Sequence, residues 1–326
     1  MKVFENISLK AYNTFGIDTK ARRMAVLEPG DDPASLPLED AWMVLGGGSN
    51  MVFTKDYDGM VVRLDAVQEV SVRPDGNSAT VTAWGGMVMD DLVAWSLEQG
   101  LYGLENLTAI PGTVGASVVQ NVGAYGVEAK DVVESVEVYD LREGRCCTFS
   151  NEDCCFAYRD SMFKHAAGRF LVLRVSYRLR REFTANLSYK ALEGLPHASA
   201  AELRQAIADL RWGKLPRPEE HGSAGSFFKN PVVGEEVYEG LRQRFDDMPE
   251  AHRTAEGYKL SAGWLIDRAG WKGRTMGKAG VWPRNALVLY NAGGCTGAEV
   301  VALAREIQQD VEQKFGVSLT PEAIII

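Results

Sequence analysis

The amino-acid sequence predicts an α+β protein, and three features lead to this prediction. Short apolar stretches separated by glycine-rich turns fill much of the first half, which is typical of β-strands. Longer segments with the apolar spacing of helices are more common in the second half. No glycine cluster has the Rossmann fingerprint that opens a doubly wound parallel sheet.

In the first half we expect strands wherever residues are apolar or alternate with period two. These expected strands cover residues 42–45, 51–53, 59–64, 67–72, 79–84, 132–139 and 170–179. The turn Pro74-Asp75-Gly76-Asn77 predicts a hairpin between the strands on either side of it. Asp90 and Asp91 open an expected helix that ends at Gly100.

Residues 103–126 are dense in small and polar side chains and show no sustained period. We therefore expect an irregular segment there. A long irregular segment inside a compact domain is usually either functional or disordered. Apolar residues such as Leu104 and Ile110 argue against disorder, so the prediction is a functional segment.

The second half predicts four helices, over residues 200–212, 235–245, 261–269 and 296–315. Thr296 and Glu299 have the spacing of a capping box at the start of the last one. We expect a strand over 285–290 and strand-like ends over 317–319 and 324–326. The charged, proline-rich residues 213–220 predict a domain boundary.

Composition restricts the function classes. The chain has 326 residues, and its 44 acidic and 35 basic residues give a formal net charge of -9. This charge argues against broad nucleic-acid binding but leaves room for a local pocket that binds one anionic metabolite. Polar residues interrupt the first ten positions, and no stretch reaches the roughly 18 apolar residues of a membrane span. We expect a soluble, cytoplasmic protein with no membrane partner.

The cysteines and histidines do not suggest a metal site. Five cysteines occur as two adjacent pairs and one single residue, and none has the C-x-x-C spacing of zinc or redox sites. The four histidines do not complement them. We expect no metal, and cysteines that are reduced, small, buried side chains.

Two glycine-rich clusters are candidates for a nucleotide site. The first cluster consists of Gly46, Gly47, Gly48, Ser49 and Asn50 and is followed by the apolar Met51. Such a turn lets backbone N–H groups approach a phosphate, but it lacks the P-loop ending and can equally be a hairpin turn. The sequence leaves these two interpretations open.

The second cluster lies in the irregular segment. Its candidate residues are Pro111, Gly112, Gly115, Ala116, Asn121, Gly123, Ala124 and Tyr125. A dinucleotide such as FAD can lie along such a segment, although a tightly packed loop is the alternative. Two clusters in one β-rich half favour a nucleotide cofactor bound without a Rossmann unit.

Three further residues are candidates for chemistry. Arg159 can bind a carboxylate through its planar fork, but Asp160 beside it makes a structural ion pair the favoured interpretation from spacing alone. Ser226 does not fit a nucleophile elbow and is better interpreted as a proton donor or ligand. Glu322 is either a solvated edge residue or a placed acid, and its neighbours do not decide.

Taken together, the motifs resemble one family, the UDP-N-acetylenolpyruvoylglucosamine reductases. The resemblance spans nearly the whole chain in order. The matching segments are 13–16 (NTFG), 46–50 (GGGSN), 103–106 (GLEN), 110–112 (IPG), 120–126 (QNVGAYG), 158–164 (YRDSMFK), 225–231 (GSFFKNP), 261–267 (SAGWLID) and Pro321-Glu322. Tyr189 in the sequence Leu187-Ser188-Tyr189 is similar to the longer family type, in which a loop closes over substrate.

The resemblance implies a two-part FAD-binding region of the vanillyl-alcohol-oxidase (PCMH) type and a smaller α+β substrate-binding domain. We expect the two FAD-binding subdomains to cover residues 1–66 and 67–212. The substrate-binding domain is expected to cover residues 213–326, and its C-terminal segment to return to the active site. The implied reaction begins when NADPH reduces FAD and NADP⁺ leaves. Hydride then passes from flavin N5 to C3 of the enolpyruvyl ether of UDP-N-acetylglucosamine, and C2 is protonated to give UDP-N-acetylmuramate.

The resemblance also implies a role for individual residues. Arg159 and Glu322 match residues that polarise the substrate carboxylate, where negative charge accumulates, and Glu322 would act in its protonated form. Ser226 matches the proton donor to C2. The residues that match UDP-sugar contacts are Tyr189, Lys214, Asn230 and Lys259. The flavin contacts are expected in both glycine clusters, from Gly46 to Met51 and at the eight residues of the second cluster.

Some expectations remain open. Ile324 stands where many relatives have an arginine, so contacts to the nucleotide end of the substrate can differ. Another FAD enzyme of the same fold, such as an oxidase, and a sugar-nucleotide or flavin-binding module without activity are the alternative functions. We expect a monomer.

Overall fold

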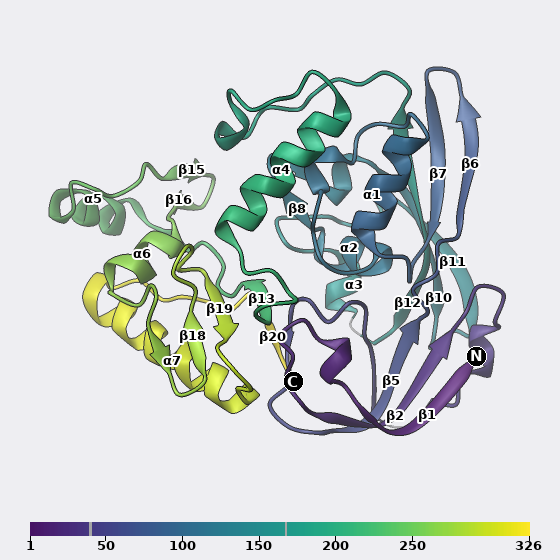
Figure 1. The fold of residues 1–326 in the computed structure, drawn as a ribbon, viewed down its shortest axis with the longest axis horizontal. Helices are drawn as coiled ribbons and strands as arrows, with labels where there is room; N and C mark the ends of the chain where they lie inside the picture. Colours follow the sequence, from purple (N-terminus) through teal and green to yellow (C-terminus); the bar gives the residue numbers. More distant parts are fainter. Residues whose placement is uncertain (39–40, 167) are drawn as a thin grey trace. The chain divides into compact units, whose positions relative to one another are not determined.

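The computed structural model describes residues 1–38, 41–166 and 168–326 (Figure 1). The chain divides into two compact units that alternate along the sequence. Unit 1 consists of Met1–Ile7, Ala21–Gly47 and Asp58–Arg211. Unit 2 consists of Ser8–Lys20, Gly48–Tyr57 and Trp212–Ile326.

The first sheet of unit 1 has four strands in the order β1-β2-β5-β3. Their bounds are β1 Lys2–Ser8, β2 Lys20–Leu27, β3 Trp42–Val44 and β5 Tyr57–Leu64. β3 and β5 are parallel, and Trp42 lies opposite Met60. The face that carries Met60 and Val62 packs into a cluster with Trp84 and Leu171, and Val61 is buried on the opposite face, so this stretch of β5 is covered on both sides.

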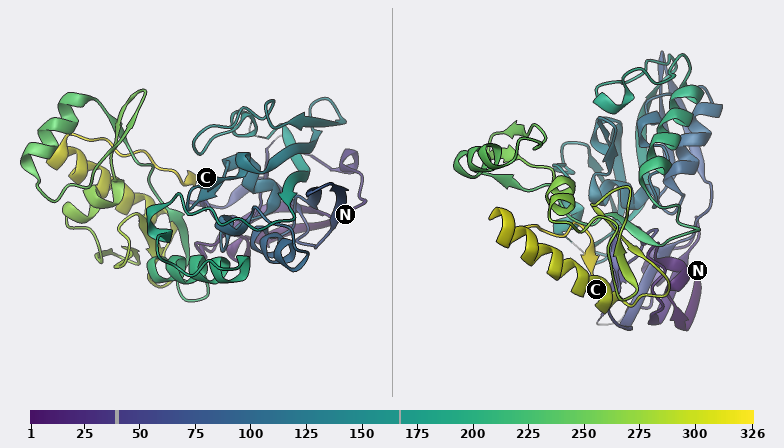
Figure 2. Two further views of the ribbon diagram at one scale, coloured as in Figure 1. Left: turned by 90° about the horizontal axis from the view of Figure 1, so that it is seen from above. Right: turned by 60° about the vertical axis from the view of Figure 1, so that its left-hand side comes forward.

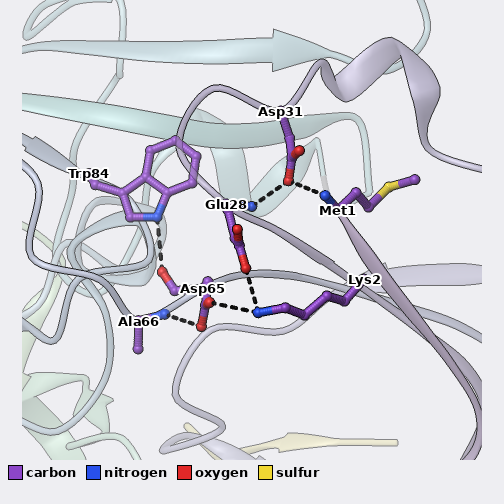
Figure 3. A network of polar contacts seen from close by, with 7 residues as sticks. All are labelled: Met1, Lys2, Glu28, Asp31, Asp65, Ala66 and Trp84. Carbon is purple, nitrogen blue, oxygen red and sulfur yellow. Dashed lines mark hydrogen bonds and ion pairs between the residues drawn. The ribbon is translucent and has the colours of Figure 1, made fainter.

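Polar contacts at the start of the chain hold the edge strand β1 (Figure 3). The α-amino group of Met1 pairs with Asp31 at 2.6 Å, and Lys2 pairs with Glu28. Trp84 donates from Nε1 to the carbonyl of Asp65 at 2.9 Å. Lys2 and Glu28 are exposed, so this second ion pair adds little to the stability of the strand.

The second sheet of unit 1 is antiparallel, in the order β11-β10-β12-β7-β6. Its strands are β6 Val70–Asp75, β7 Ser78–Trp84, β10 Val133–Asp140, β11 Arg145–Ser150 and β12 Phe170–Arg180. Asp75 pairs with Ser78, which confirms the predicted hairpin turn. Helices α1 (Met89–Glu98) and α2 (Val114–Gln120) pack on this sheet through a common apolar core (Figure 1).

The expected irregular segment 103–126 is more regular than the sequence indicates. It contains the short helix α2 and the strand β8 (Gly123–Ala124), which pairs with β9 (Val127–Glu128). Thr113 caps α2 by accepting a hydrogen bond from Ala116 N at 3.3 Å. A helix of seven residues is too short to show a sustained apolar period, so the expectation of an irregular segment was wrong.

Unit 1 also contains the short helix α3 (Met162–His165) and the helix α4 (Ala200–Lys214), of which residues up to Arg211 belong to this unit. Leu203 and Ile207 on α4 are fully buried. They pack with Leu192 and with the partly buried Tyr125 in a separate small cluster. This cluster connects α4 with the loop that precedes it and with the segment after β8.

Unit 2 contains two small antiparallel sheets and three helices. The strands are β13 Ser223–Ser226, β14 Val232–Val233, β15 His252–Thr254, β16 Gly257–Lys259, β17 Thr275–Met276, β18 Ala279–Val281 and β19 Val288–Asn291. The helices are α5 Glu235–Arg244, α6 Ala262–Arg268 and α7 Gly297–Phe315. The orders are β13-β19-β18-β17 and β14-β16-β15, and α7 lies along the first sheet (Figures 1 and 2).

The C-terminal strand β20 (Ile324–Ile325) pairs in parallel with β4 (Met51–Val52). The predicted capping box at Thr296 and Glu299 is confirmed, with mutual hydrogen bonds of 2.8 and 3.2 Å. The expected strand over 317–319 does not form, because Val317 and Leu319 are buried under α7 without pairing. The expected strand over 285–290 begins only at Val288, after a turn at Asn285.

The burial of the cysteines differs from expectation. Cys154 and Cys295 are buried, and burial raises the pKa of the Cys154 thiol to about 12. Cys146 and Cys155 are exposed, so burial was wrongly expected for these two residues. Across the described ranges no helix has the length and apolar character needed to cross a membrane.

Candidate active site

The two glycine clusters meet in unit 1. A Cβ atom on Gly46 would lie 2.9 Å from the Ala116 side chain, and one on Gly47 would lie 2.7 Å from Cα of Gly112. Both distances are shorter than real Cβ contacts, so only glycine permits this approach. The start of the first cluster therefore packs against the residues that open α2, as a shared nucleotide site requires.

The second cluster is fixed from beneath by the neighbouring sheet. Gly115 donates its N–H to the carbonyl of Gly85 at 2.8 Å, and a Cβ there would lie 3.1 Å from the same oxygen. Pro111 is half-buried immediately before Gly112, and Ala116 is half-buried in the first turn of α2. Around Gly112 and Gly115 the cluster therefore consists of backbone and small side chains.

The first cluster continues in unit 2 from Gly48 onward. Gly48 has φ +61°, and a Cβ atom would collide with the carbonyl oxygen of Tyr12. The carbonyl of Gly48 accepts a hydrogen bond from Thr14 N at 3.2 Å. Buried Asn13 holds this turn, because its amide donates to Leu9 and Ile17 carbonyls at 2.7 and 3.0 Å. The early NTFG motif thus supports the glycine turn.

Three candidate residues have a left-handed backbone. Asn121, Tyr125 and Arg159 have φ of +44°, +51° and +55°, values that non-glycine residues rarely adopt. Strained residues of this kind gather at functional sites, where surrounding contacts hold them in place. Asn121 is fully buried and donates from Nδ2 to the carbonyl of Ala157 at 2.8 Å, which joins the second cluster to the turn before Arg159.

Arg159 is held against the second cluster. Its Nη2 donates to the carbonyl of Gly123 at 2.7 Å, next to Ala124 in β8. Lys164 donates from Nζ to the Arg159 carbonyl at 2.9 Å and to Gln120 Oε1 at 2.8 Å. Asp160 pairs with His165 at 2.7 Å. The Asp160 carboxylate thus bonds His165, and the Arg159 guanidinium bonds the Gly123 carbonyl.

A bulge in unit 2 presents Ser226. Pairing between β13 and β19 shifts register between Ser223 and Ser226, and Gly225 within the bulge has φ +68°. Phe227 and Phe228 are both almost fully buried and anchor the strand that follows. Ser226 itself is exposed, so the hydroxyl is available to a ligand.

The C-terminal segment runs beside Ser226. The N–H of Glu322 donates to the carbonyl of Phe227 at 2.8 Å, and Lys229 N donates to the carbonyl of Thr320 at 2.9 Å. Ser226 and half-buried Glu322 are thus on neighbouring backbone segments, although nearly a hundred positions separate them in the sequence. Asn50 of the first cluster bonds the C-terminal segment, since its Nδ2 donates to the Glu322 carbonyl at 3.2 Å.

The strand pair β4 and β20 extends this arrangement. Ile324 N donates to the carbonyl of Asn50 at 2.8 Å, and Met51 lies opposite Ile324. Ser49 is half-buried in the preceding turn. Ile324 is 42% exposed, so packing in the core does not explain why isoleucine stands at this position, where an arginine is common among relatives.

The four candidate substrate contacts lie on several elements. Tyr189 is 45% exposed in unit 1, and its ring centroid lies 5.5 Å from that of Tyr125 at an interplanar angle of 85°. In unit 2, Asn230 accepts from Ala262 N at 3.0 Å, and Lys259 is half-buried in β16 opposite Val232. Lys214 is the exposed last residue of α4.

Sequence reasoning assigned no role to several residues that support these groups. Lys164 was noted only as part of a motif, although it fixes the turn at Arg159. Asn106 donates to the carbonyls of Tyr125 and Asn186 at 2.8 and 3.0 Å. Arg211 forms a side-chain hydrogen bond with Tyr125. The GLEN motif pointed to Asn106, whereas nothing in the pattern of α4 distinguishes Arg211 from its other arginines.

Two family models match the chain. The model described as "FAD binding domain" matches residues 39–150, which include both glycine clusters. The model described as "UDP-N-acetylenolpyruvoylglucosamine reductase, C-terminal domain" matches residues 217–326, which include Ser226 and Glu322. The predicted fold class, an FAD-binding region of the vanillyl-alcohol-oxidase type followed by a smaller α+β domain, is confirmed.

Whole-chain comparisons agree with the family models. The chain is 45% identical to UDP-N-acetylenolpyruvoylglucosamine reductase from Burkholderia ambifaria, over 98% of this chain and 95% of the relative. It is 44% identical to the Pseudomonas aeruginosa reductase, over 99% and 98%. The crystal structure of the reductase from Thermus caldophilus superposes with a TM-score of 0.68 and 25% identity, over 100% and 99%. The chain therefore belongs to the UDP-N-acetylenolpyruvoylglucosamine reductase family.

Proposed function

We propose that Arg159, Ser226 and Glu322 are the catalytic residues of an FAD-dependent reductase of a UDP-linked sugar. Arg159 and Glu322 stabilise negative charge on the substrate, and Ser226 supplies a proton. The protein is an NADPH-dependent flavoenzyme that converts the enolpyruvyl ether of UDP-N-acetylglucosamine to UDP-N-acetylmuramate, a peptidoglycan precursor. The observation that carries the proposal is the backbone pairing of unit 2, which brings Glu322 beside the exposed Ser226.

The residues fit an FAD molecule. Side chains at Gly46 and Gly47 would collide with the second cluster, so glycine is what lets the two clusters lie together, and the atoms they meet belong to backbone and small side chains. We propose that FAD is held by Gly46–Met51 of the first cluster and by the eight candidate residues of the second. When bound, FAD accepts hydride from NADPH and supplies it to the substrate.

The protein residues manage charge and protons during that reduction. Hydride adds to C3 of the enolpyruvyl group, and the electron pair of the double bond moves to C2 and into the carboxylate. Arg159 donates hydrogen bonds to this carboxylate, and protonated Glu322 donates a further one, so the growing charge is stabilised as it forms. The hydroxyl of Ser226 then gives its proton to C2, which completes the lactyl ether.

The remaining assignments concern the UDP-sugar and the organisation of the chain. We propose that Lys214, Asn230 and Lys259 bind the UDP-sugar and that Tyr189 closes over the diphosphate. The proposed division is 1–66 and 67–212 for FAD and 213–326 for substrate, and the family model that matches residues 217–326 supports the last of these boundaries. We also propose a cytoplasmic monomer, as expected from the sequence.

Anaerobic spectroscopy of the purified holoenzyme tests the function. NADPH should bleach the flavin absorbance, and the enolpyruvyl substrate should restore it without oxygen. An oxidase would recover its colour only when oxygen is admitted. A flavin-binding module without activity would not be bleached by NADPH, and either result would contradict the proposal.

A further inference from the structure

Helix α4 packs against Tyr125, which follows β8. Arg204 and Arg211 are seven residues apart and therefore share one face of the helix. Arg204 pairs with Asp90 at 3.0 Å, and Asp90 also accepts from Ala109 N at 2.7 Å. Arg211 forms its side-chain hydrogen bond with Tyr125, just after β8, which Figure 1 draws beside α4.

Tyr125 is fixed at two ends. Its carbonyl accepts from Asn106 Nδ2 at 2.8 Å, which holds the left-handed backbone, and its side chain is bonded to Arg211. Burial raises the pKa of Tyr125, so the phenol stays protonated. Because both its backbone and its side chain are held, the Tyr125 ring is a fixed surface on which another side chain can pack.

The side chain of Tyr189 packs on the Tyr125 ring. The two rings meet edge to face with centroids 5.5 Å apart, and Tyr189 is otherwise 45% exposed. The chain after it turns inward, because Leu192 donates its N–H to the Tyr189 carbonyl at 2.8 Å and is itself fully buried. The orientation of the exposed ring therefore depends on Tyr125 and on this anchored turn.

Arg211 is an unusual choice if its role is only to stabilise α4. Its Nε is buried without a hydrogen-bond partner among the described residues, and burial lowers the pKa of its guanidinium. The charged groups that face it are Asp90, which attracts it, and Arg159, which repels it. A buried, incompletely paired charge usually costs folding stability relative to an apolar side chain.

We propose that Arg211 is a positioning residue for substrate binding, which acts through Tyr125 to hold Tyr189 in place over the diphosphate of the substrate. This inference rests on the proposed function, in which Tyr189 makes that contact. Arg211 acts without contacting the substrate or the flavin. Its effect should appear in the affinity for the UDP-sugar and not in the reduction of the flavin by NADPH.

The test compares Arg211→Met with a matched change, Arg204→Met, in the FAD-loaded enzyme. Arg211→Met should raise KM for the enolpyruvyl substrate about five- to tenfold, as the loss of one hydrogen bond predicts, and leave the rate of bleaching by NADPH unchanged. Thermal stability should be equal or higher. Arg204→Met should leave KM unchanged. Equal KM values for wild type and Arg211→Met, or equal increases in the two variants, would overturn the proposal.

A double-mutant cycle tests the coupling to Tyr189. In a Tyr189→Phe background, Arg211→Met should raise KM no further, because the hydroxyl that it positions is already absent. Additive increases would contradict the proposal. Tyr125→Phe removes the same hydrogen bond from the other side and decides the matter if Arg211→Met does not fold.

Hydrogen exchange separates this inference from the proposed function. In the holoenzyme without substrate, Arg211→Met should accelerate exchange of the amides of residues 187–192 and leave the core strand β12 unchanged. Unchanged exchange at 187–192 would overturn the positioning role even if the enzyme reduces the substrate. Accelerated exchange in a protein that does not reduce the substrate would instead contradict only the proposed function.

Discussion

Arg159 shows how one side chain can serve two acceptors. Its Nη2 is bonded to the Gly123 carbonyl at 2.7 Å, and a planar guanidinium has further donors in the same fork. The left-handed backbone at this residue, φ +55°, fixes the direction in which the fork leaves the chain. We infer that the function of Arg159 depends on the planar shape of its guanidinium as well as on its charge.

Arg159→Lys should therefore reduce kcat/KM for the enolpyruvyl substrate about ten- to a hundredfold, because an ammonium group cannot replace a bidentate charged pair. Steady-state kinetics at saturating NADPH measures the effect. Bleaching by NADPH should stay at the wild-type rate. If Arg159→Lys turned over like the wild type, another group would have to bind the carboxylate.

Asp140 gives a prediction for pH. It is 2% exposed and accepts from Arg169 Nε and Nη2 at 2.9 and 2.6 Å and from two backbone N–H groups. The hydrogen bonds from Arg169 lower the pKa of Asp140 to about 2. A lowered folded-state pKa means that the stabilisation is complete above the unfolded value near 4 and disappears as pH falls towards 2.

Asp140→Asn should remove this contribution. We expect a loss on the order of 1–2 kcal/mol in the free energy of unfolding at pH 7, discounted because the Arg169 side chain is partly exposed. The variant and the wild type should converge in stability between pH 4 and 2. Urea unfolding at several pH values measures this, and a constant difference across that range would contradict the assignment.

Among the elements, the contact between the glycine turn and α2 is the most restrictive. Gly47→Ala would place a methyl group 2.7 Å from Gly112 Cα, a backbone atom that cannot rotate away. Overpacking of this kind costs about 1–3 kcal/mol, so the affinity for FAD should fall at least about tenfold. The ratio of flavin to protein absorbance after dialysis reports the loss.

Gly240→Ala is the matched control. A Cβ atom there meets nothing within 4 Å, and the position lies in α5. This variant should keep its flavin and gain up to about 1 kcal/mol of stability from helix propensity. Loss of flavin in Gly240→Ala, or full retention in Gly47→Ala, would contradict the assigned contact.

Local signals explain which elements the sequence predicts well. The hairpin of β6 and β7 follows from its turn residues, and α7 follows from its capping box and apolar period. Helix α2 escapes prediction because seven residues do not establish a period. Residues 317–319 resemble a strand but only fill space beneath α7, which apolarity alone does not distinguish from pairing.

For the whole molecule, the sequence identifies the parts of the site only through motifs in a fixed order. Spacing alone favoured an Arg159–Asp160 ion pair and left Glu322 undecided. Glu322 lies beside Ser226 because the C-terminal segment pairs with Phe227, directly after β13. This contact is long-range, and no local sequence pattern predicts it. Arg211 was missed for the same reason, because its partner Tyr125 lies far away in the sequence.

The central claim is that Ser226 acts only after hydride has reached carbon, and rapid mixing of the Ser226→Ala holoenzyme tests it most directly. Ser223→Ala is the control, since Ser223 bonds Thr14 through backbone groups that alanine keeps. In Ser226→Ala, bleaching by NADPH should match the wild type, whereas reoxidation by the enolpyruvyl substrate should slow by about 10²–10⁴, the scale of positioned acid catalysis. Equal slowing of both half-reactions, or wild-type reoxidation, would contradict the account.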